Sequence, residues 1–205
     1  MTRAVPRRRG RPRAYDPEVA LQQARDTFWR NGFAATSMDD LASGMGMNRP
    51  SIYAAFGDKR GLYRAAATDY ATSSRAWLES ALTRERALRD ELTSIYRDAR
   101  DFYLAGDDGP RGCFLIGTAV TESRTDGDVG DIVEATMCGF TAMFTKRFER
   151  AERDGELSPF APDALAQIAT ATLNTLAMRA RTGAQREVLD ELIEAAVGLI
   201  CRPRA

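Results

Sequence analysis

Residues 37–56, SMDDLASGMGMNRPSIYAAF, carry the clearest structural signal in the N-terminal part of this chain. Ser37 followed by Asp40 is the pattern of a helix N-cap, in which the two side chains satisfy backbone N–H groups of the first turn. The run GMGM predicts a tight turn. Asn48 then predicts the N-cap of a second helix, which tolerates Pro50 in its first turn. The stretch therefore predicts two short helices separated by a tight turn.

The spacing of three residues predicts how these two helices pack. Helices that cross steeply need a small residue at the crossing, a glycine at the turn and a branched apolar residue between them. Ala42, Gly46 and Ile52 supply these three residue types in that order. The pattern favours a helix-turn-helix, whose second helix carries short side chains that fit a DNA major groove. An ordinary pair of helices in an all-α domain has the same spacing, so that alternative stays open on these residues alone.

The charge distribution favours the nucleic-acid interpretation. The 205 residues have a formal net charge of 0, but residues 1–64 carry 12 basic and 6 acidic side chains, a net of +6, and residues 65–205 carry 17 and 23, a net of −6. Six arginines and no acid lie in the first 13 residues. A basic end on a neutral protein is expected where that end meets a polyanion. Lys59, at the predicted start of the next helix, adds a further candidate phosphate ligand.

The rest of the chain also predicts helices, giving an all-α fold of about nine. Strand-like alternation is absent, and glycine and proline clusters are few. The other predicted helices cover about 16–31, where Gly32 ends the first of them, then 59–82, a segment from 88 to about 104, a short one near 113, 129–153, 162–181 and 186–201. No apolar run approaches the ~20 residues that a membrane helix needs.

The composition excludes several classes of site. The chain has no histidine, which removes Ser-His-Asp and Cys-His nucleophilic pairs as well as histidine-ligated metals. The three cysteines lie far apart and form no CxxC pair, so neither a zinc cage nor a disulfide scaffold is indicated. Free thiols are typical of a reducing cytoplasm. We therefore expect a cytoplasmic protein with no catalytic residues, no cofactor and no metal site.

Residues 10–70 resemble the DNA-binding domain of TetR-family transcriptional regulators (TetR/AcrR type). The family pattern appears here as Gly32-Phe33, Thr36-Ser37, Leu41-Ala42 with Gly46, Ile52-Tyr53 with Phe56, and Lys59 with Leu62. The resemblance implies a basic flexible arm at 1–13, a DNA-binding domain at 14–74 and an effector-binding and dimerisation domain at 75–205. The resemblance covers residues 10–70 without a gap and is weaker in the C-terminal part.

The resemblance also implies the DNA contacts. Family members bind operator DNA as dimers, with the third helix in the major groove. Arg49 is the candidate for reading a base, because an arginine fork can hold a guanine edge. The residues that the resemblance assigns to DNA are Arg8, Arg9, Thr36, Ser37, Asn48, Arg49, Pro50, Ser51, Tyr53 and Lys59.

The C-terminal part is expected to hold a small-molecule effector and the dimer interface. The resemblance implies a homodimer through the last two helices, which carry small and apolar residues on much of their circumference. An intrachain core gives the same pattern. The effector is expected to be largely apolar, with Glu122 as the one inner acid. Candidate pocket residues are Tyr96, Phe102, Tyr103, Phe114, Val120, Met137, Phe140 and Phe144, although residues of these types at helical spacing also form ordinary cores.

The resemblance thus implies a repressor that binds a palindromic operator and leaves it when an effector binds. Two alternatives to this function remain. Cys113 follows Arg111-Gly112 at a predicted helix start, which can lower a thiol pKa, so a redox- or electrophile-sensing regulator is one of them. A small buried side chain is the other interpretation of Cys113, and Cys138 and Cys201 are predicted to be structural. The second alternative is a nonspecific architectural DNA-binding protein, which binds any duplex with similar affinity.

Overall fold

The computed structural model describes residues 16–82, 86–106 and 109–202. Within these ranges it contains nine α-helices, one π-helical turn and no strand, which confirms the predicted all-α fold. In chain order the elements are α1 (Pro17–Ala35), α2 (Met38–Gly44), α3 (Arg49–Phe56), α4 (Lys59–Leu82), α5 (Leu88–Leu104), the π-helical turn η1 (Leu115–Ala119), α6 (Val120–Glu122), α7 (Gly127–Arg153), α8 (Pro162–Arg181) and α9 (Arg186–Ile200). The predicted arm with Arg8 and Arg9 lies outside the described residues.

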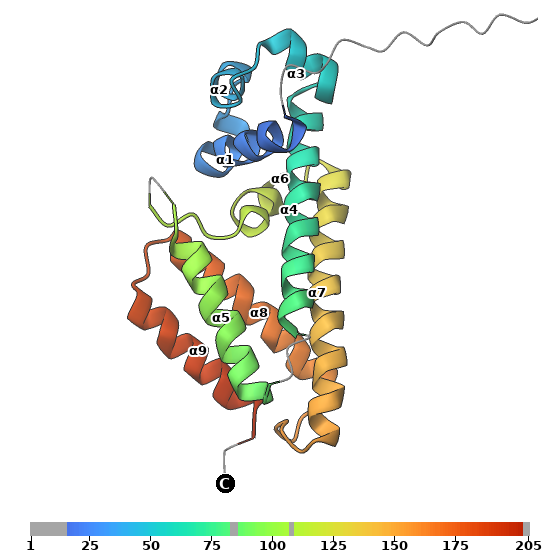
Figure 1. The fold of residues 1–205 in the computed structure, drawn as a ribbon, viewed down its shortest axis with the longest axis vertical. Coiled ribbons are helices and arrows are strands. Elements are labelled where there is room, and N and C mark those ends of the chain that lie inside the picture. The colour runs from blue at the N-terminus through green and yellow to red at the C-terminus, as the bar shows by residue number, and fades with distance from the viewer. Residues whose placement is uncertain (1–15, 83–85, 107–108, 203–205) are drawn as a thin grey trace, which may run out of the picture.

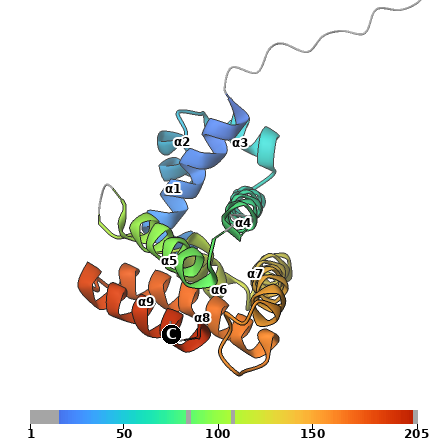
Figure 2. The same cartoon turned by 60° about the horizontal axis from the view of Figure 1, so that its bottom comes forward.

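The helices form a small N-terminal group joined to a larger bundle. Figure 1 shows α1, α2 and α3 at one end of the molecule, with α4 leading away from them alongside α7. The helices α5, α8 and α9 pack against one another, and α8 packs against α7 (Figure 2). The long helix α4 crosses the predicted domain boundary at residue 74 and so belongs to both parts. Among the described helices, none is long and apolar enough to span a membrane.

Side-chain caps start the N-terminal helices where the sequence predicts them. The Asp16 carboxylate accepts from the N–H of Glu18 at 2.9 Å and so caps α1. Ser37 and Asp40 form the reciprocal capping box of α2, and the Asn48 side chain accepts from the N–H of Ser51 at the start of α3. Each cap satisfies N–H groups that have no partner inside the helix. These caps fix where the short helices α2 and α3 begin.

The predicted helix break at Gly32 is confirmed, but a further helical turn, which the sequence analysis did not predict, follows it within α1. Gly32 has a φ of +76°, which breaks the helical path, but the chain resumes one further helical turn to Ala35. Phe33 in that turn packs its ring against Phe28, with 6.1 Å between centroids, and against Tyr63 at 5.0 Å. These contacts hold the extra turn in place, and they depend on a residue of α4 that lies 30 positions later in the chain.

An aromatic cluster joins the N-terminal group to the bundle. Phe114, which is fully buried just before η1, has ring centroids 5.6 Å from Trp29, 5.7 Å from Tyr63 and 5.7 Å from Tyr70. Trp29 lies on α1 and the two tyrosines on α4. The expectation that Phe114 lines an effector pocket is therefore wrong, because its ring is enclosed by other aromatic rings.

Candidate DNA interface and effector cavity

The helix-turn-helix presents one exposed face of α3. Leu41 and Ile52 are fully buried between α2 and α3, and Gly46 adopts a φ of +59° in the turn between them. Burial of these apolar side chains leaves the opposite side of α3 free for a ligand. Five predicted DNA-contact residues lie at the start of α3 or on it: Asn48, Arg49, Pro50 and Tyr53 are exposed, and Ser51 is half-buried. Ser37, another predicted contact, is exposed at the start of α2.

The Arg49 side chain is held by Asp39, a residue that the sequence analysis did not assign to the site. Its Nε donates to Asp39 Oδ1 at 2.7 Å, and its Nη2 pairs with Asp39 Oδ2, so both carboxylate oxygens engage the guanidinium. The hydrogen bond from Arg49 lowers the pKa of Asp39 below its usual value. Asp39 lies on α2 and Arg49 on α3, so only the fold of the turn brings them together. Asp39 thus positions the one arginine on the exposed face of α3.

Two of the predicted phosphate ligands have internal roles instead. Thr36 is only 1% exposed, and its hydroxyl donates to the carbonyl oxygen of Gly32 at 2.6 Å. The Lys59 Nζ donates to the carbonyl oxygens of Phe33 at 2.8 Å and Thr36 at 2.7 Å. It also lies 4.4 Å from the centre of the Phe33 ring. The expectation that Thr36 contacts DNA is wrong because its side chain is buried, and Lys59 ties the start of α4 to the end of α1.

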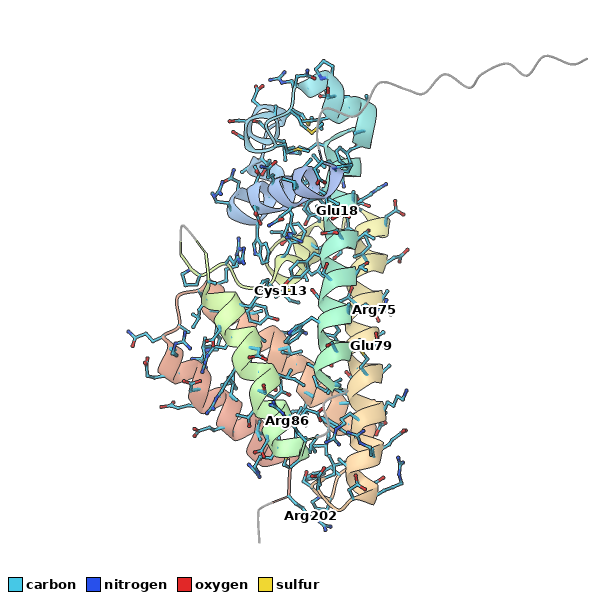
Figure 3. The ribbon with its side chains drawn as sticks, viewed as in Figure 1. Glu18, Arg75, Glu79, Arg86, Cys113 and Arg202 are labelled. Atoms are coloured by element: carbon cyan, nitrogen blue, oxygen red, sulfur yellow. The ribbon has the colours of Figure 1, made fainter. Side chains whose placement is uncertain are left out.

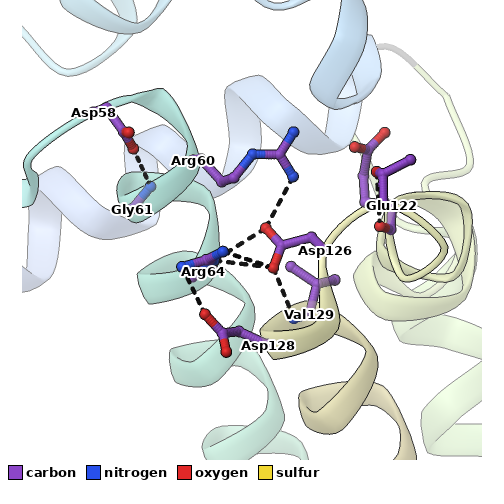
Figure 4. Close-up of polar contacts among 9 residues, drawn as sticks. Asp58, Arg60, Gly61, Arg64, Glu122, Asp126, Asp128 and Val129 are labelled. Atoms are coloured by element: carbon purple, nitrogen blue, oxygen red, sulfur yellow. Dashed lines mark hydrogen bonds and ion pairs between the residues drawn. The ribbon is translucent and has the colours of Figure 1, made fainter.

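A buried carboxylate connects α4 to α7. Asp126 caps α7 and its side chain is fully buried, where it accepts from Arg60 at 2.9 Å and from Arg64 at 2.8 Å (Figure 4). Arg64 also pairs with the exposed Asp128 at 2.6 Å. The hydrogen bonds from Arg64 and then from Arg60 lower the pKa of Asp126 to about 2. This cluster joins the first turns of the helix that follows α3 to the bundle.

Replacing Asp126 with asparagine is expected to destabilise the protein in a pH-dependent way. An aspartate pKa of about 2 in the folded state, against about 4 in the unfolded state, means that ionised Asp126 stabilises the fold above pH ~4. That contribution is lost as the pH falls from about 4 to about 2. At pH 7 we expect D126N to unfold about 1–3 kcal/mol more easily than wild type, as measured by urea denaturation, with the difference shrinking toward pH 2.

The matched control for this prediction is Asp128→Asn. Asp128 pairs with the same arginine but is 65% exposed, so its loss should cost less than about 1 kcal/mol. A pH-independent deficit in D126N would contradict the assignment of the stabilising interaction to the ionised carboxylate.

A cavity of about 200 Å³ lies between α1, α4, α5, η1, α7 and α8. Four of the predicted pocket residues line it: Phe102, Tyr103, Met137 and Phe140. The remaining lining residues, which were not predicted as pocket residues, are Arg25, Tyr70, Ser73, Ser74, Trp77, Asp98, Ala99, Cys113, Leu115, Thr136 and Asn174. The cavity is therefore largely aromatic and apolar, with a few polar groups on its wall.

The other predicted pocket residues do not line this cavity. Tyr96 is fully buried and its hydroxyl donates to the carbonyl oxygen of Ala169, which makes it part of the core. Phe144 is also fully buried and packs against Phe148. Val120 lies in α6 and is 45% exposed. Glu122, the expected inner acid, is half-buried beside it and outside the cavity, and the acid on the cavity wall is Asp98.

Cys113 lies on the cavity wall but does not have a lowered pKa. Figure 3 shows it inside the molecule between α4 and α5, and the Tyr70 hydroxyl donates to its sulfur at 3.4 Å. Burial raises the pKa of the thiol and outweighs this hydrogen bond and the backbone N–H groups of η1. Of the two interpretations of Cys113, the structure favours the small buried side chain, because a raised thiol pKa leaves less of the nucleophilic thiolate. Cys138, predicted to be structural, is exposed, whereas Cys201 is buried.

The end of α8 contacts the N-terminal group directly. The Arg181 guanidinium donates to the carbonyl oxygens of Trp29 at 3.3 Å and Arg111 at 3.1 Å. The Trp29 indole N–H donates to the same Arg111 carbonyl at 2.8 Å. A side chain of the bundle thus hydrogen-bonds to the backbone of α1.

One face of α8 and α9 stays uncovered in the single chain. Leu173, Leu176 and Ala177 point into the bundle, in keeping with an intrachain core on that side. The opposite face carries small and apolar residues at helical spacing that are exposed or half-buried: Ala164, Ile168, Ala171, Thr175 and Met178 on α8, and Val188, Leu192, Ala195 and Leu199 on α9.

Comparison with known proteins places the chain in a family. Residues 20–66 match the family model of bacterial regulatory proteins of the tetR family, and residues 90–196 match the tetracyclin repressor-like C-terminal domain. The chain belongs to the TetR family of transcriptional regulators, as the resemblance of residues 10–70 predicts.

Individual relatives agree with this assignment. The HTH-type transcriptional repressor ComR of Escherichia coli (strain K12) is 29% identical over 192 residues, which are 93% of this chain and 91% of ComR. A structure of the TetR family regulator CifR, a cysteine mutant complexed with a 26-bp double-strand operator DNA, is 31% identical with a TM-score of 0.80, covering 91% of this chain and 98% of CifR. The reduced form of E. coli NemR shares the fold, with a TM-score of 0.80, 17% identity and coverage of 92% and 98% of the two chains.

Proposed function

We propose that this TetR-family protein is a cytoplasmic repressor that binds a palindromic operator as a homodimer and leaves it when a small, largely apolar effector enters the cavity. The observation that carries the proposal is the exposed face of α3, where Arg49 stands in a fixed orientation against Asp39. An arginine at the N-terminal end of a recognition helix reads a guanine edge in the major groove. ComR, a relative along almost the whole chain, is a transcriptional repressor, and we expect no enzymatic activity here.

The uncovered face of α8 and α9 supports dimerisation through these helices. Ile168 and Met178 on α8 and Leu199 on α9 are between 37% and 55% exposed, and the residues between them are mostly small. Small residues let helices approach closely, so two copies of this face would form a four-helix interface. A two-fold dimer presents two α3 helices to two half-sites related by the same symmetry.

The contacts between the bundle and the N-terminal group support release by an effector. The cavity wall includes Arg25 of α1 and Tyr70 of α4, and Arg181 at the end of α8 holds the backbone of α1. A molecule that alters the cavity therefore acts on the helices that carry α3. Because the coupling free energy is shared, effector and operator must weaken each other's binding by the same factor.

Selection from a random duplex library tests this function on the full-length protein. We expect an inverted repeat to be enriched and bound roughly a thousandfold or more tightly than a scrambled duplex of equal length at the same salt concentration. We also expect the protein to sediment as a dimer in analytical ultracentrifugation. Equal affinity for selected and scrambled duplexes would contradict the proposal and indicate an architectural DNA-binding protein.

A further inference from the structure

We propose that the effector is a one-ring apolar acid, whose ring fills the cavity and whose carboxylate binds the guanidinium of Arg25. This inference rests on the proposed function, since it names the chemistry of the molecule that occupies the same cavity. It is carried by the polar groups of the cavity wall, by the volume of the cavity and by the position of Arg25 on α1.

Arg25 has a donor that no described residue satisfies. Its side chain is 18% exposed, and its Nη1 pairs with Asp69 of α4 at 3.1 Å. The Nε of the same guanidinium is buried and has no hydrogen-bond partner among the described residues. Buried N–H groups are nearly always satisfied in native proteins. Asp69 therefore leaves the Arg25 guanidinium incompletely bonded, and a carboxylate in the cavity can satisfy the spare N–H once the guanidinium turns from Asp69 toward the cavity that Arg25 lines.

The chemistry of an arginine favours a carboxylate as that acceptor. The planar guanidinium offers neighbouring N–H groups that match the two oxygens of a carboxylate. Asp98, the acid on the wall, takes part in another interaction, whereas the Arg25 guanidinium keeps one N–H without a partner in the described part of the chain. The guanidinium carbon also lies 5.9 Å from the centre of the Tyr70 ring, so the charged group stands next to the aromatic part of the wall.

The volume and the walls set the size and polarity of the rest of the ligand. The cavity measures about 200 Å³, and an apolar cavity of about 150 Å³ holds one benzene molecule. The difference leaves room for a few more heavy atoms, as in phenylacetate. Trp77, Phe102 and Phe140 give the ring aromatic surroundings.

Binding at Arg25 would act on the DNA-binding part of the molecule. Asp69 of α4 holds Arg25 of α1 in the free protein, and a carboxylate in the cavity competes for the same guanidinium. A weakened contact between these residues loosens α1 from α4, and α4 is the helix that follows α3. The ligand class thus fits a molecule that alters the position of α3.

Isothermal titration of full-length protein with three matched ligands tests the proposal. We expect phenylacetate to bind about tenfold or more tightly than its neutral amide, phenylacetamide, because a hydrogen bond to a charged partner replaces one to a neutral group. Phenethylamine, the matched cation, should bind more weakly than both. Equal affinities for acid and amide, or no binding of the acid, would overturn the inference. The inference would also be overturned if phenethylamine bound most tightly of the three ligands and lost this affinity in Asp98→Asn.

Two variants with opposite expected effects make the test independent of folding defects. Arg25→Met should abolish the preference for the acid and leave amide binding within about twofold. Asp69→Asn should tighten acid binding about three- to tenfold, since it removes the competing carboxylate without touching the cavity. An unchanged acid affinity in D69N together with an unchanged preference in R25M would overturn the inference. Failure of the proposed function would appear separately, as loss of sequence selectivity in DNA binding measured without any ligand.

Discussion

Replacing Arg49 with alanine is expected to reduce binding to the selected operator by about 10- to 100-fold and to leave binding to scrambled DNA nearly unchanged. Arg49 is the one arginine on the exposed face of α3 among the described residues, and Asp39 fixes its guanidinium before DNA arrives. A bidentate contact to a guanine edge is worth ~1–3 kcal/mol of discrimination. Fluorescence anisotropy with operator and scrambled duplexes at one salt concentration measures both affinities.

The matched control is Arg97→Ala, which removes an exposed arginine from α5, far from α3 in the fold. This variant should bind both duplexes like wild type. An equal loss of affinity for operator and scrambled DNA in R49A would show that Arg49 contacts phosphate rather than a base. Asp39→Asn should lower the operator preference by a smaller factor, because the guanidinium keeps its charge but loses its fixed orientation.

Replacing Phe114 with alanine is expected to lower the free energy of unfolding by about 3–5 kcal/mol. The side chain is fully buried among Trp29, Tyr63 and Tyr70, and these neighbours belong to two helices that cannot close the space without moving apart from their other partners. The loss therefore includes both the buried apolar surface and the cavity left behind. Urea unfolding followed by circular dichroism at pH 7 measures the change.

Val120→Ala is the control for this substitution. Val120 lies six residues later and is 45% exposed, so its truncation should change the stability by no more than about 0.5 kcal/mol. A deficit below 1 kcal/mol in F114A would contradict the view that this ring joins the N-terminal group to the bundle. An intermediate deficit in Phe114→Leu, which restores most of the volume, would confirm that packing is the cause.

Local sequence signals predicted the helices well because caps and breakers act within a few residues. The bounds of α3, α4 and α8 agree with the predicted ranges, and Asn48 caps α3 as expected. Gly32 breaks the helix as predicted, and only the further turn to Ala35 was missed, since Phe33 in that turn gains a partner from α4, a tertiary contact.

The candidate site was harder to predict because lining a cavity depends on the neighbours of each helix. Tyr96 and Tyr103 are both buried on α5, but only Tyr103 borders the cavity. Arg25 belongs to the DNA-binding part in sequence, and nothing in its surroundings along the chain indicates a position on the cavity wall. For Cys113 the sign of the pKa shift depended on burial, which the dipeptide Gly-Cys does not reveal.

The length of α4 turns small movements near the cavity into larger ones at the DNA. Its 24 residues span about 36 Å at 1.5 Å per residue, so a tilt of about 5° about its far end displaces the end next to α3 by about 3 Å. Hydrogen bonds to base edges tolerate only a fraction of that displacement. Two half-sites lie about 34 Å apart along the duplex. If α4 tilts in both subunits of a dimer, the distance between the two α3 helices no longer matches this spacing. A small displacement of the cavity wall therefore corresponds to a larger displacement of α3.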